Sequence, residues 1–419
     1  MSAVPGELLA AKGGDADVAA RFSLTPPPPG FIDDPFPVYR ALREHAPVKQ
    51  IGEASWLLSR HEDLARVYKD TALFSSDKKV EFAPKFGDGH LFAHHTTSLV
   101  FNDPPLHTRV RRILAGALNP RAVSGLEPDV IALVDRLLDA METKTDAVDL
   151  IEDFAAAIPI EVIGNLLDVP HDERGPLRDW SLAILGALEP ALTAAQFKRG
   201  EDAVRDFLAY LETLVARRRA DPGDPDRDML TRLIAGERDG GRLSEAELLH
   251  NCIFILNAGH ETTTNLIGNA LELLDRFEGE RARLIGEPAL IASAIEEVLR
   301  YESPNQLGNR RTTAPVEIGG VAMPAGSGLT LCIGAANRDP AAFDDPERFD
   351  VARKPNRHLA FASGPHQCTG MNVARLEGRI AIARFLARFP RYRLEGAPLR
   401  SQRIRFRGFT SIPARLKPV

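Results

Sequence analysis

The chain of 419 residues is poor in cysteine and tryptophan, with three residues of the first and two of the second. Cys252, Cys332 and Cys368 lie far apart in the sequence. This spacing excludes a disulfide framework and suits a reducing compartment, so we expect a cytoplasmic protein. No run of about eighteen consecutive apolar residues occurs, and the sequence therefore predicts no membrane-spanning helix. The N-terminal segment lacks a basic stretch followed by an apolar one, so no secretory signal is expected.

An excess of positive charge is also absent. The net charge is −6, and 26% of the residues are charged while 44% are hydrophobic. A negative balance implies no general affinity for nucleic acid, and this composition fits a globular protein with a large core. Prolines cluster only at 26–29, and neither an internal repeat nor a linker is visible. We therefore expect an N-terminal arm over residues 1–29 and a single domain over residues 30–419.

The spacing of apolar residues predicts a mainly α protein with a minor β part. Spacings of three and four dominate from about residue 120 to 300 and over 371–388, whereas 310–335 and the C-terminal tail contain short β-like runs. The segments expected near the N-terminus are a helix over 34–42, a hairpin over 48–60, a helix over 60–68 and a surface loop over 70–100.

Residues 361–370 place one cysteine in a tight loop that contains Gly364 and Gly370. Glycine can adopt backbone angles that are closed to other residues. Cys368 directly precedes a helix-like run that starts near Met371, and the unpaired N–H groups and dipole of a helix start favour thiolate over thiol. A thiolate without a second cysteine nearby is a nucleophile, a redox thiol or a single axial metal ligand, and the alternative is a buried structural cysteine.

A long helix is predicted from Ser244 to about Leu274. The segment 244–247 has the pattern of a capping box, and about thirty residues give a rod of about 45 Å. The middle of this rod, residues 258–263, combines a glycine with polar residues, at a cost of about 1 kcal/mol for the glycine. The segment is either a kink with a back-bonding threonine or a local opening with a function.

Two further pairs carry little information in isolation. His107 and Arg111 are four residues apart and share one face of a helix that opens near residue 102, which by itself indicates a solvated basic face. Glu297 and Arg300 are three residues apart, a spacing that usually gives a surface pair worth a few tenths of a kcal/mol.

The loop pattern Phe-x-x-Gly-x-x-x-Cys-x-Gly resembles the haem-ligand loop of the cytochrome P450 family. The order of the helix near His107, the long helix, the Glu-x-x-Arg pair and the loop extends this resemblance from about residue 30 to the end. It implies the cytochrome P450 fold, a triangular helical domain with haem between the long central helix and the helix that follows the cysteine loop. Cys368 would be the thiolate ligand of haem b, and electron donation from this thiolate favours O–O cleavage. Ala362 and Thr369 depart from the usual pattern, which has glycine and an aliphatic residue there.

The resemblance also implies roles for individual residues. Glu261 and Thr262 match an acid–alcohol pair that delivers protons during dioxygen reduction, beside a local opening that admits dioxygen and water. The implied haem contacts are His107, Arg111, Arg310 (or its neighbour Arg311) and His366 at the propionates, Phe361 near the sulfur, and Ala258 and Gly259. Glu297, Arg300 and Arg348 match a structural triad. The implied substrate pocket consists of Phe92, Leu99, Val100, Leu185, Asn257, Leu307 and Phe409.

The family implies a haem-thiolate monooxygenase that inserts one oxygen atom from O2 into a small organic substrate. Most pocket positions are apolar, which favours a hydrophobic substrate, and Asn257 with His94 and His95 would read a polar group. No flavin or nicotinamide fingerprint and no cysteine cluster appears, so a separate ferredoxin and reductase would supply electrons. The candidate basic docking face consists of Arg109, Arg112, Arg353, Lys354, Arg375 and Arg379. We expect a monomer with no nucleic-acid or membrane partner.

Two alternatives remain open on the sequence. A peroxide-driven haem-thiolate peroxygenase needs no reductase, but that branch typically lacks the acid–alcohol pair, so Glu261 and Thr262 argue against it. A non-catalytic haem-binding sensor or carrier would not need a proton-delivery pair, and no output domain is visible.

Overall fold

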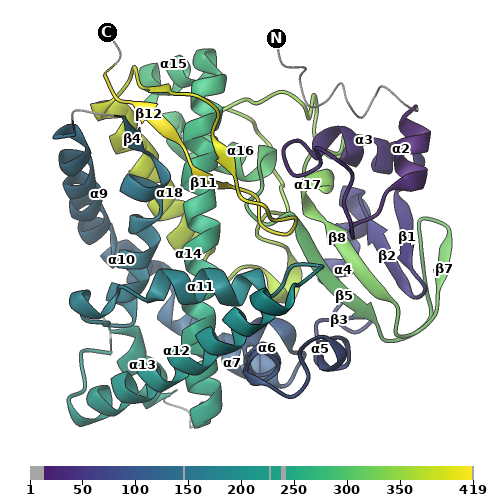
Figure 1. Ribbon diagram of the computed structural model, residues 1–419, viewed down its shortest axis with the longest axis horizontal. Helices are drawn as coiled ribbons and strands as arrows, with labels where there is room; N and C mark the ends of the chain where they lie inside the picture. The colour runs from purple at the N-terminus through teal and green to yellow at the C-terminus, as the bar shows by residue number, and fades with distance from the viewer. Residues whose placement is uncertain (1–13, 145–146, 226–227, 237–241, 418–419) are drawn as a thin grey trace. The chain divides into compact units, whose positions relative to one another are not determined.

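The computed structural model describes residues 14–144, 147–225, 228–236 and 242–417 (Figure 1). The described chain is mainly helical with small β sheets, which confirms the predicted class. Its contacts divide it into two compact units. Unit 1 comprises Met1–Ser76, Arg276–Cys368 and Leu399–Thr410, and unit 2 comprises Asp77–Asp275, Thr369–Pro398 and Ser411–Val419. None of the helices in the described ranges is long and apolar enough to cross a membrane.

Unit 1 is built on a five-stranded sheet in the order β1-β2-β8-β5-β3. The strands are β1 (Val48–Gly52), β2 (Ser55–Leu58), β3 (Phe74–Ser75), β5 (Leu307–Thr312) and β8 (Gly328–Cys332). β1 and β2 form the predicted hairpin, β2 runs parallel to β8, and β5 runs antiparallel to β8. Two segments that are distant in sequence thus share one sheet.

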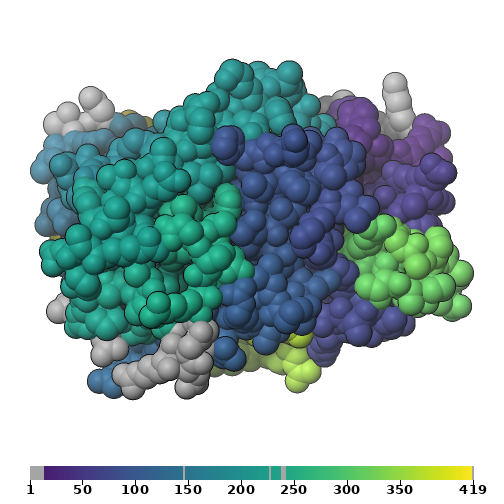
Figure 2. All heavy atoms as spheres, turned by 90° about the horizontal axis from the view of Figure 1, so that it is seen from below, coloured from purple at the N-terminus to yellow at the C-terminus, as the bar shows by residue number. Residues whose placement is uncertain are grey.

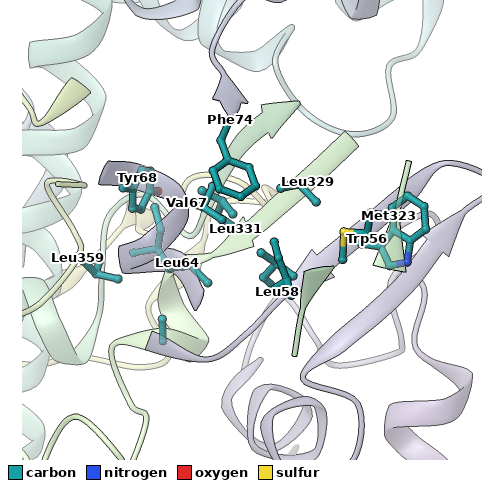
Figure 3. Packing of buried hydrophobic residues seen from close by; sticks show 13 residues of the cluster. Trp56, Leu58, Leu64, Val67, Tyr68, Phe74, Met323, Leu329, Leu331 and Leu359 are labelled. Carbon is teal, nitrogen blue, oxygen red and sulfur yellow. The ribbon is translucent and has the colours of Figure 1, made fainter. Parts of the chain in front are cut away.

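A compact apolar cluster joins this sheet to α4 (His61–Lys69) (Figure 3). Leu64 and Val67 of the helix and Leu331 of β8 are completely buried, and Tyr68 is nearly so. The other elements of unit 1 are α2 (Asp15–Arg21), α3 (Phe36–His45), α15 (Glu278–Gly286), η4 (Pro288–Leu290), α16 (Ile291–Tyr301), β6 (Val316–Ile318), β7 (Val321–Met323), α17 (Ile333–Ala336), η5 (Gly364–His366), β10 (Leu399–Arg400) and β11 (Phe409–Ser411).

Unit 2 is organised around α14 (Glu245–Arg276), a helix of 32 residues. The predicted capping box is present, because the Glu247 carboxylate accepts the Ser244 N–H at 2.8 Å and the Glu247 N–H donates to Ser244 Oγ at 3.2 Å. The helices around it are α5 (Lys79–Phe86), α6 (His90–Thr97), η1 (Leu99–Phe101), α7 (Leu106–Ala117), α8 (Pro120–Gly125), α9 (Glu127–Glu142), η2 (Ile151–Ala155), α10 (Ala157–Leu166), η3 (His171–Glu173), α11 (Leu177–Gly186), α12 (Ala194–Ala220), α13 (Met229–Ala235) and α18 (Met371–Arg388). β4 (Val148–Asp149), β12 (Pro413–Arg415) and β9 (Arg393–Leu394) form a small sheet.

The prediction of a surface loop over 70–100 is wrong, because this segment forms β3, α5 and α6. Short helices are marginal without tertiary packing. Here the buried rings of Phe82 and Phe86 on α5 pack against His95 of α6, with centroids 5.6 and 5.3 Å from the His95 ring. In the predicted N-terminal arm, residues 1–13 lie outside the described ranges. The later part forms α2, whose Ala19 is buried in a core cluster of unit 1.

Candidate active site

The cysteine loop closes on itself in unit 1. The Cys368 N–H donates to the Phe361 carbonyl at 2.9 Å, and the Gln367 N–H donates to the Gly364 carbonyl at 3.0 Å. Cys368 is exposed, whereas Cys252 and Cys332 are buried. Burial raises the pKa of both buried thiols to about 12, so these two groups are inert. Of the three cysteines, Cys368 is the one that is accessible to a metal ion or another ligand.

The two loop glycines differ in what they do. Gly364 has φ +69°, and a Cβ there would lie 2.5 Å from the Tyr68 carbonyl oxygen at the end of α4. Gly370 has φ −87°, and a Cβ there would meet nothing within 4 Å, so it does not use the freedom that the sequence suggested. Ala362 adopts φ +54°, which is the left-handed conformation that glycine occupies more easily.

We expect Gly364→Ala to lower the free energy of unfolding by at least about 2 kcal/mol, because it adds left-handed strain and a clash with backbone. Gly370→Ala is the matched control and should change stability by less than about 0.5 kcal/mol. Urea denaturation of both variants measures the difference. Equal urea midpoints for the two variants would contradict the prediction, because they would show that the backbone around Gly364 can move to make room for a Cβ.

The aromatic side of the loop is fixed by hydrogen bonds. The Phe361 ring lies 5.8 Å from the His358 ring, centroid to centroid. His358 Nδ1 accepts the Ala360 N–H at 3.3 Å, so its Nε2 carries the proton and donates to Glu296 at 3.1 Å. His366 is half-buried in η5. The Phe361 side of the loop is therefore tied to α16 through His358 and Glu296.

Arg310 and Arg311 point to different places. The Arg310 side chain is buried, with its guanidinium carbon 5.2 Å from the centre of the Tyr68 ring. Burial raises the pKa of Tyr68 to about 12, although the Arg310 charge opposes this. Arg311 Nε donates to the Gly326 carbonyl at 3.2 Å. Since Gly364 touches the Tyr68 backbone, Arg310 is the arginine that lies on the cysteine-loop side of β5.

The predicted structural triad is present with one change of member. Arg300 Nε and Nη2 each donate to a Glu297 carboxylate oxygen at 2.8 Å, and both side chains are completely buried. Arg353 Nε donates to the same carboxylate at 3.1 Å. The Arg348 side chain is 59% exposed and contributes only its carbonyl, which accepts from Arg300 at 3.0 Å. The assignment of Arg348 to the triad is therefore wrong, because the chain turns its side chain outward and places Arg353 at the carboxylate.

In unit 2, α14 is helical throughout residues 258–263, so the expected local opening is not a break in the helix. Thr262 Oγ1 donates to the Ala258 carbonyl at 2.6 Å. Ala258 is exposed and Thr262 half-buried, whereas Glu261 is buried. A Cβ at Gly259 would overlap Ile163 Cδ1 of α10, so this glycine permits close helix packing. The middle of α14 thus shows one accessible face with a threonine hydroxyl on it.

Asn257 has only 2% of its surface exposed, and neither atom of its amide has a hydrogen-bond partner within the described ranges. An unsatisfied buried polar group costs about 1–3 kcal/mol. A water or a ligand group is the usual partner at such a position. The neighbouring His260 is also buried, and its Nδ1 lies 3.3 Å from Ser181 Oγ of α11. Asn257 is therefore one side chain of α14 whose polar atoms have no partner among the described residues.

The start of α7 places His107 inside and Arg111 at half-burial, as expected for one helix face. Arg109 points elsewhere, because its Nη1 donates to Glu247 at 3.0 Å. Two members of the suggested basic docking face are thus paired with carboxylates, Arg353 with the buried Glu297 and the partly exposed Arg109 with Glu247. Lys354 and Arg379 are exposed.

The predicted pocket positions fall on both units. In unit 2, Phe92 and Val100 are half-buried, and Leu99 and Leu185 are buried. In unit 1, Leu307 and Phe409 are buried, and the Arg400 guanidinium carbon lies 3.9 Å from the centre of the Phe409 ring.

Three histidine rings gather where α6 meets α14. The His94 ring centroid lies 5.0 Å from that of His95 and 5.7 Å from that of His250, and all three side chains are buried. Burial removes hydration from the charged form. It therefore lowers the pKa of His250 to about 4 and the pKa of His94 well below its usual range. Both rings are neutral at physiological pH.

We expect the protein to lose stability as the pH falls from about 6.5 towards 4. The unfolded chain binds protons at His94 and His250 below about pH 6.5, whereas in the folded state both histidines stay unprotonated until the pH is much lower. Each histidine can therefore cost up to about 1.4 kcal/mol per pH unit in this window. Urea midpoints at several pH values measure the slope, and His250→Phe should flatten it. His171→Gln is the control because the His171 side chain is 77% exposed, and an unchanged slope in His250→Phe would contradict this account.

Comparisons with known proteins identify the family. The family model described as Cytochrome P450 matches residues 183–276 and 285–415. The chain belongs to the cytochrome P450 family. It is 37% identical over 409 residues to cytochrome P450 107B1 of Saccharopolyspora erythraea, which covers 92% of this chain and 96% of that protein. It is 36% identical to the vitamin D(3) 25-hydroxylase of Pseudonocardia autotrophica, covering 86% of this chain and 87% of the relative.

Solved structures agree with these relatives. The crystal structure of P450BioI in complex with a hexadec-9Z-enoic acid ligated acyl carrier protein matches with a TM-score of 0.86 and 32% identity. That match covers 92% of this chain and 98% of the other. The predicted cytochrome P450 fold is confirmed, and the chain is a cytochrome P450 monooxygenase.

Proposed function

We propose that this enzyme holds haem b through Cys368 and inserts one oxygen atom from O2 into a hydrophobic small organic molecule. The observation that carries the proposal is the exposed thiol of Cys368, held in a closed turn in a chain whose other thiols are buried. Haem needs one axial ligand for its iron and cationic partners for its two propionate groups. One thiolate together with several cationic side chains is a set that fits these needs. When bound, haem supplies the activation of dioxygen. The residues that would hold it are His107, Arg111, Arg310 and His366 at the propionates, with Phe361, Ala258 and Gly259 beside the ring.

Electrons would come from a separate ferredoxin with its reductase. Exposed Lys354 and Arg379 would attract an acidic partner, and such charges mainly affect the rate of encounter. Arg353 is nearly buried against Glu297, and the charge of Arg109 is largely offset by Glu247, so neither is a main part of this surface.

Thr262 would orient water rather than give up its own proton. Its hydroxyl hydrogen already points to the Ala258 carbonyl, so the lone pairs of Oγ1 are left to accept. A water donating to Oγ1 would be held on the accessible face of α14, and the proton would arrive from buried Glu261, the adjacent residue. The Thr262 hydroxyl would thus position the water, and the Glu261 carboxyl would supply the proton.

We expect Thr262→Ala to uncouple the enzyme. Substrate binding and nicotinamide oxidation should persist, while product per nicotinamide falls and peroxide appears. The reason is that the water held by Oγ1 would lose its position, and a positioned proton donor is worth about 10²–10⁴-fold in rate. Thr262→Ser should restore coupling. Glu261→Gln should instead slow nicotinamide oxidation itself.

Thr264→Ala is the matched control, because Thr264 makes the same back-bond to the His260 carbonyl at 3.0 Å but is buried. It should keep wild-type coupling. Full coupling in a folded Thr262→Ala protein would mean that protons arrive by another route. Equal product yield from peroxide without a reductase would favour a peroxygenase instead.

The substrate would be apolar with one hydrogen-bonding group. Most pocket positions are apolar, and the unsatisfied amide of Asn257 supplies one donor and one acceptor for a carbonyl or hydroxyl. The similar structures include CYP109E1 in complex with testosterone and CYP267B1 in complex with myristic acid. A screen of steroids, fatty acids and macrolactones for a shift of haem absorption to the high-spin form tests this class.

A further inference from the structure

Helix α6 is held at both ends by side chains from other helices. At its start, Glu201 of α12 accepts the His90 N–H at 2.8 Å and the Leu91 N–H at 2.9 Å, one with each carboxylate oxygen. Just beyond its other end, at the start of η1, the Leu99 N–H donates to Asn251 Oδ1 of α14 at 3.0 Å. The first N–H groups of a helix have no partner inside it, and a carboxylate is a stronger acceptor than a neutral group. Glu201 therefore caps α6 from a different helix.

The surfaces of the two helices are shaped for this contact. A Cβ at Gly89, just before α6, would lie 2.7 Å from the Glu201 carboxylate oxygens. A Cβ at Gly200 of α12 would lie 3.0 Å from Leu91 Cδ1, and Leu91 is completely buried. Gly89 thus leaves room for the Glu201 carboxylate, and Gly200 leaves room for the Leu91 side chain. Figure 2 shows the dark-blue segment that contains α6 beside the teal segment of α12 on one face.

The two side chains that accept these N–H groups differ in burial. Asn251 is completely buried in α14, whereas Glu201 is only half-buried. The start of α6 faces solvent, since Gly87 and Asp88 just before it and His90, its first residue, are exposed. A structure with few buried contacts opens first at its exposed end. The start of α6 therefore depends on the Glu201 carboxylate more than its end depends on any single group.

We propose that Glu201 is a positioning residue for substrate binding, because it fixes the start of α6 and with it the pocket wall formed by Phe92, Leu99 and Val100. The carboxylate does not touch the substrate. It holds the helix start so that the wall keeps one conformation, which lowers the ordering cost of binding. This inference rests on the proposed pocket, whereas the cap itself does not.

The cap is tested by hydrogen–deuterium exchange of the haem-loaded protein. In Glu201→Ala, the amides of His90 and Leu91 should exchange about tenfold or more faster, because two hydrogen bonds to a charged group are lost. Glu201→Gln keeps one acceptor oxygen and should give an intermediate rate. Glu212 is an exposed carboxylate on the same helix, and in Glu212→Gln the amides of His90 and Leu91 should exchange at the wild-type rate. Wild-type exchange at residues 90 and 91 in Glu201→Ala would overturn the proposal.

The effect on binding is tested with two azoles that coordinate haem iron whatever the natural substrate is. Imidazole is small, and 4-phenylimidazole must also fit the pocket wall. In Glu201→Ala, affinity for 4-phenylimidazole should fall about tenfold while affinity for imidazole changes less than about twofold. Faster exchange with equal loss or no loss for both azoles would remove the role in substrate binding and leave the proposed monooxygenase function untouched. A missing thiolate spectrum in wild-type protein would instead refute that function, with the exchange result still valid.

Discussion

We expect the replacement of Cys368 with histidine to abolish the red-shifted ferrous–CO Soret band that thiolate ligation gives in this family. A neutral imidazole cannot supply the electron donation of a thiolate, although it can still hold the iron, so haem content can persist while the band moves. We also expect monooxygenase turnover to be lost. Difference spectra of the reduced, CO-treated variant and a haem assay measure the two effects separately.

Cys252→Ala and Cys332→Ala are the matched controls. Both thiols are buried, with the pKa raised to about 12 by that burial, so neither can compete as a thiolate. Both variants should keep the band, with at most a loss of stability from the small cavities that they create. An unchanged band in Cys368→His would remove the assignment of the ligand and the proposed function with it.

Arg300→Ala should yield mostly unfolded or haem-free protein. Besides Glu297, this guanidinium donates to the carbonyls of Asn337 at 3.0 Å, Pro346 at 2.8 Å and Arg348 at 3.0 Å. Its removal leaves a completely buried carboxylate and three carbonyls short of donors. Breaking a buried pair from one side costs about 3–5 kcal/mol, which is a large part of the total stability of a domain.

The corrected triad gives this prediction a sharp control. Arg353→Ala removes a donor from the same Glu297 carboxylate and should also be strongly destabilising. Arg348→Ala removes only an exposed side chain and should cost less than about 0.5 kcal/mol. Urea midpoints and haem content of the three variants rank them. A large loss in Arg348→Ala with a small one in Arg353→Ala would return the third place to Arg348.

Local sequence patterns were sufficient for the features that depend on neighbouring residues. The capping box at Ser244, the back-bonding threonine and the helix after the cysteine loop each involve groups within four or five positions of one another. Gly364 was recognised as a loop glycine, and its positive φ agrees. The exposure of Cys368, compared with the burial of the other two cysteines, comes from the structure, because the sequence leaves a buried structural cysteine open as an alternative.

Features set by distant segments were not accessible in this way. No local pattern indicates α6, because the carboxylate that accepts its first N–H groups belongs to Glu201 of α12, more than a hundred positions later. Arg353 was missed because the direction of an arginine side chain in a loop depends on the whole turn around it. The need for Gly259 comes from Ile163 on α10, and no local rule indicates that contact.

The first turn of α14 also limits how this protein can vary. Glu247 accepts both the N–H of Ser244 and the guanidinium of Arg109 on α7, and these bonds hold the pKa of its carboxyl below the usual range. An ordinary ion pair can exchange its two partners and keep its attraction. Here an arginine at position 247 could not accept from the helix start, so a charge swap between positions 109 and 247 would restore the attraction and lose the cap. The acidic and basic ends of this pair are therefore not interchangeable, in evolution or in design.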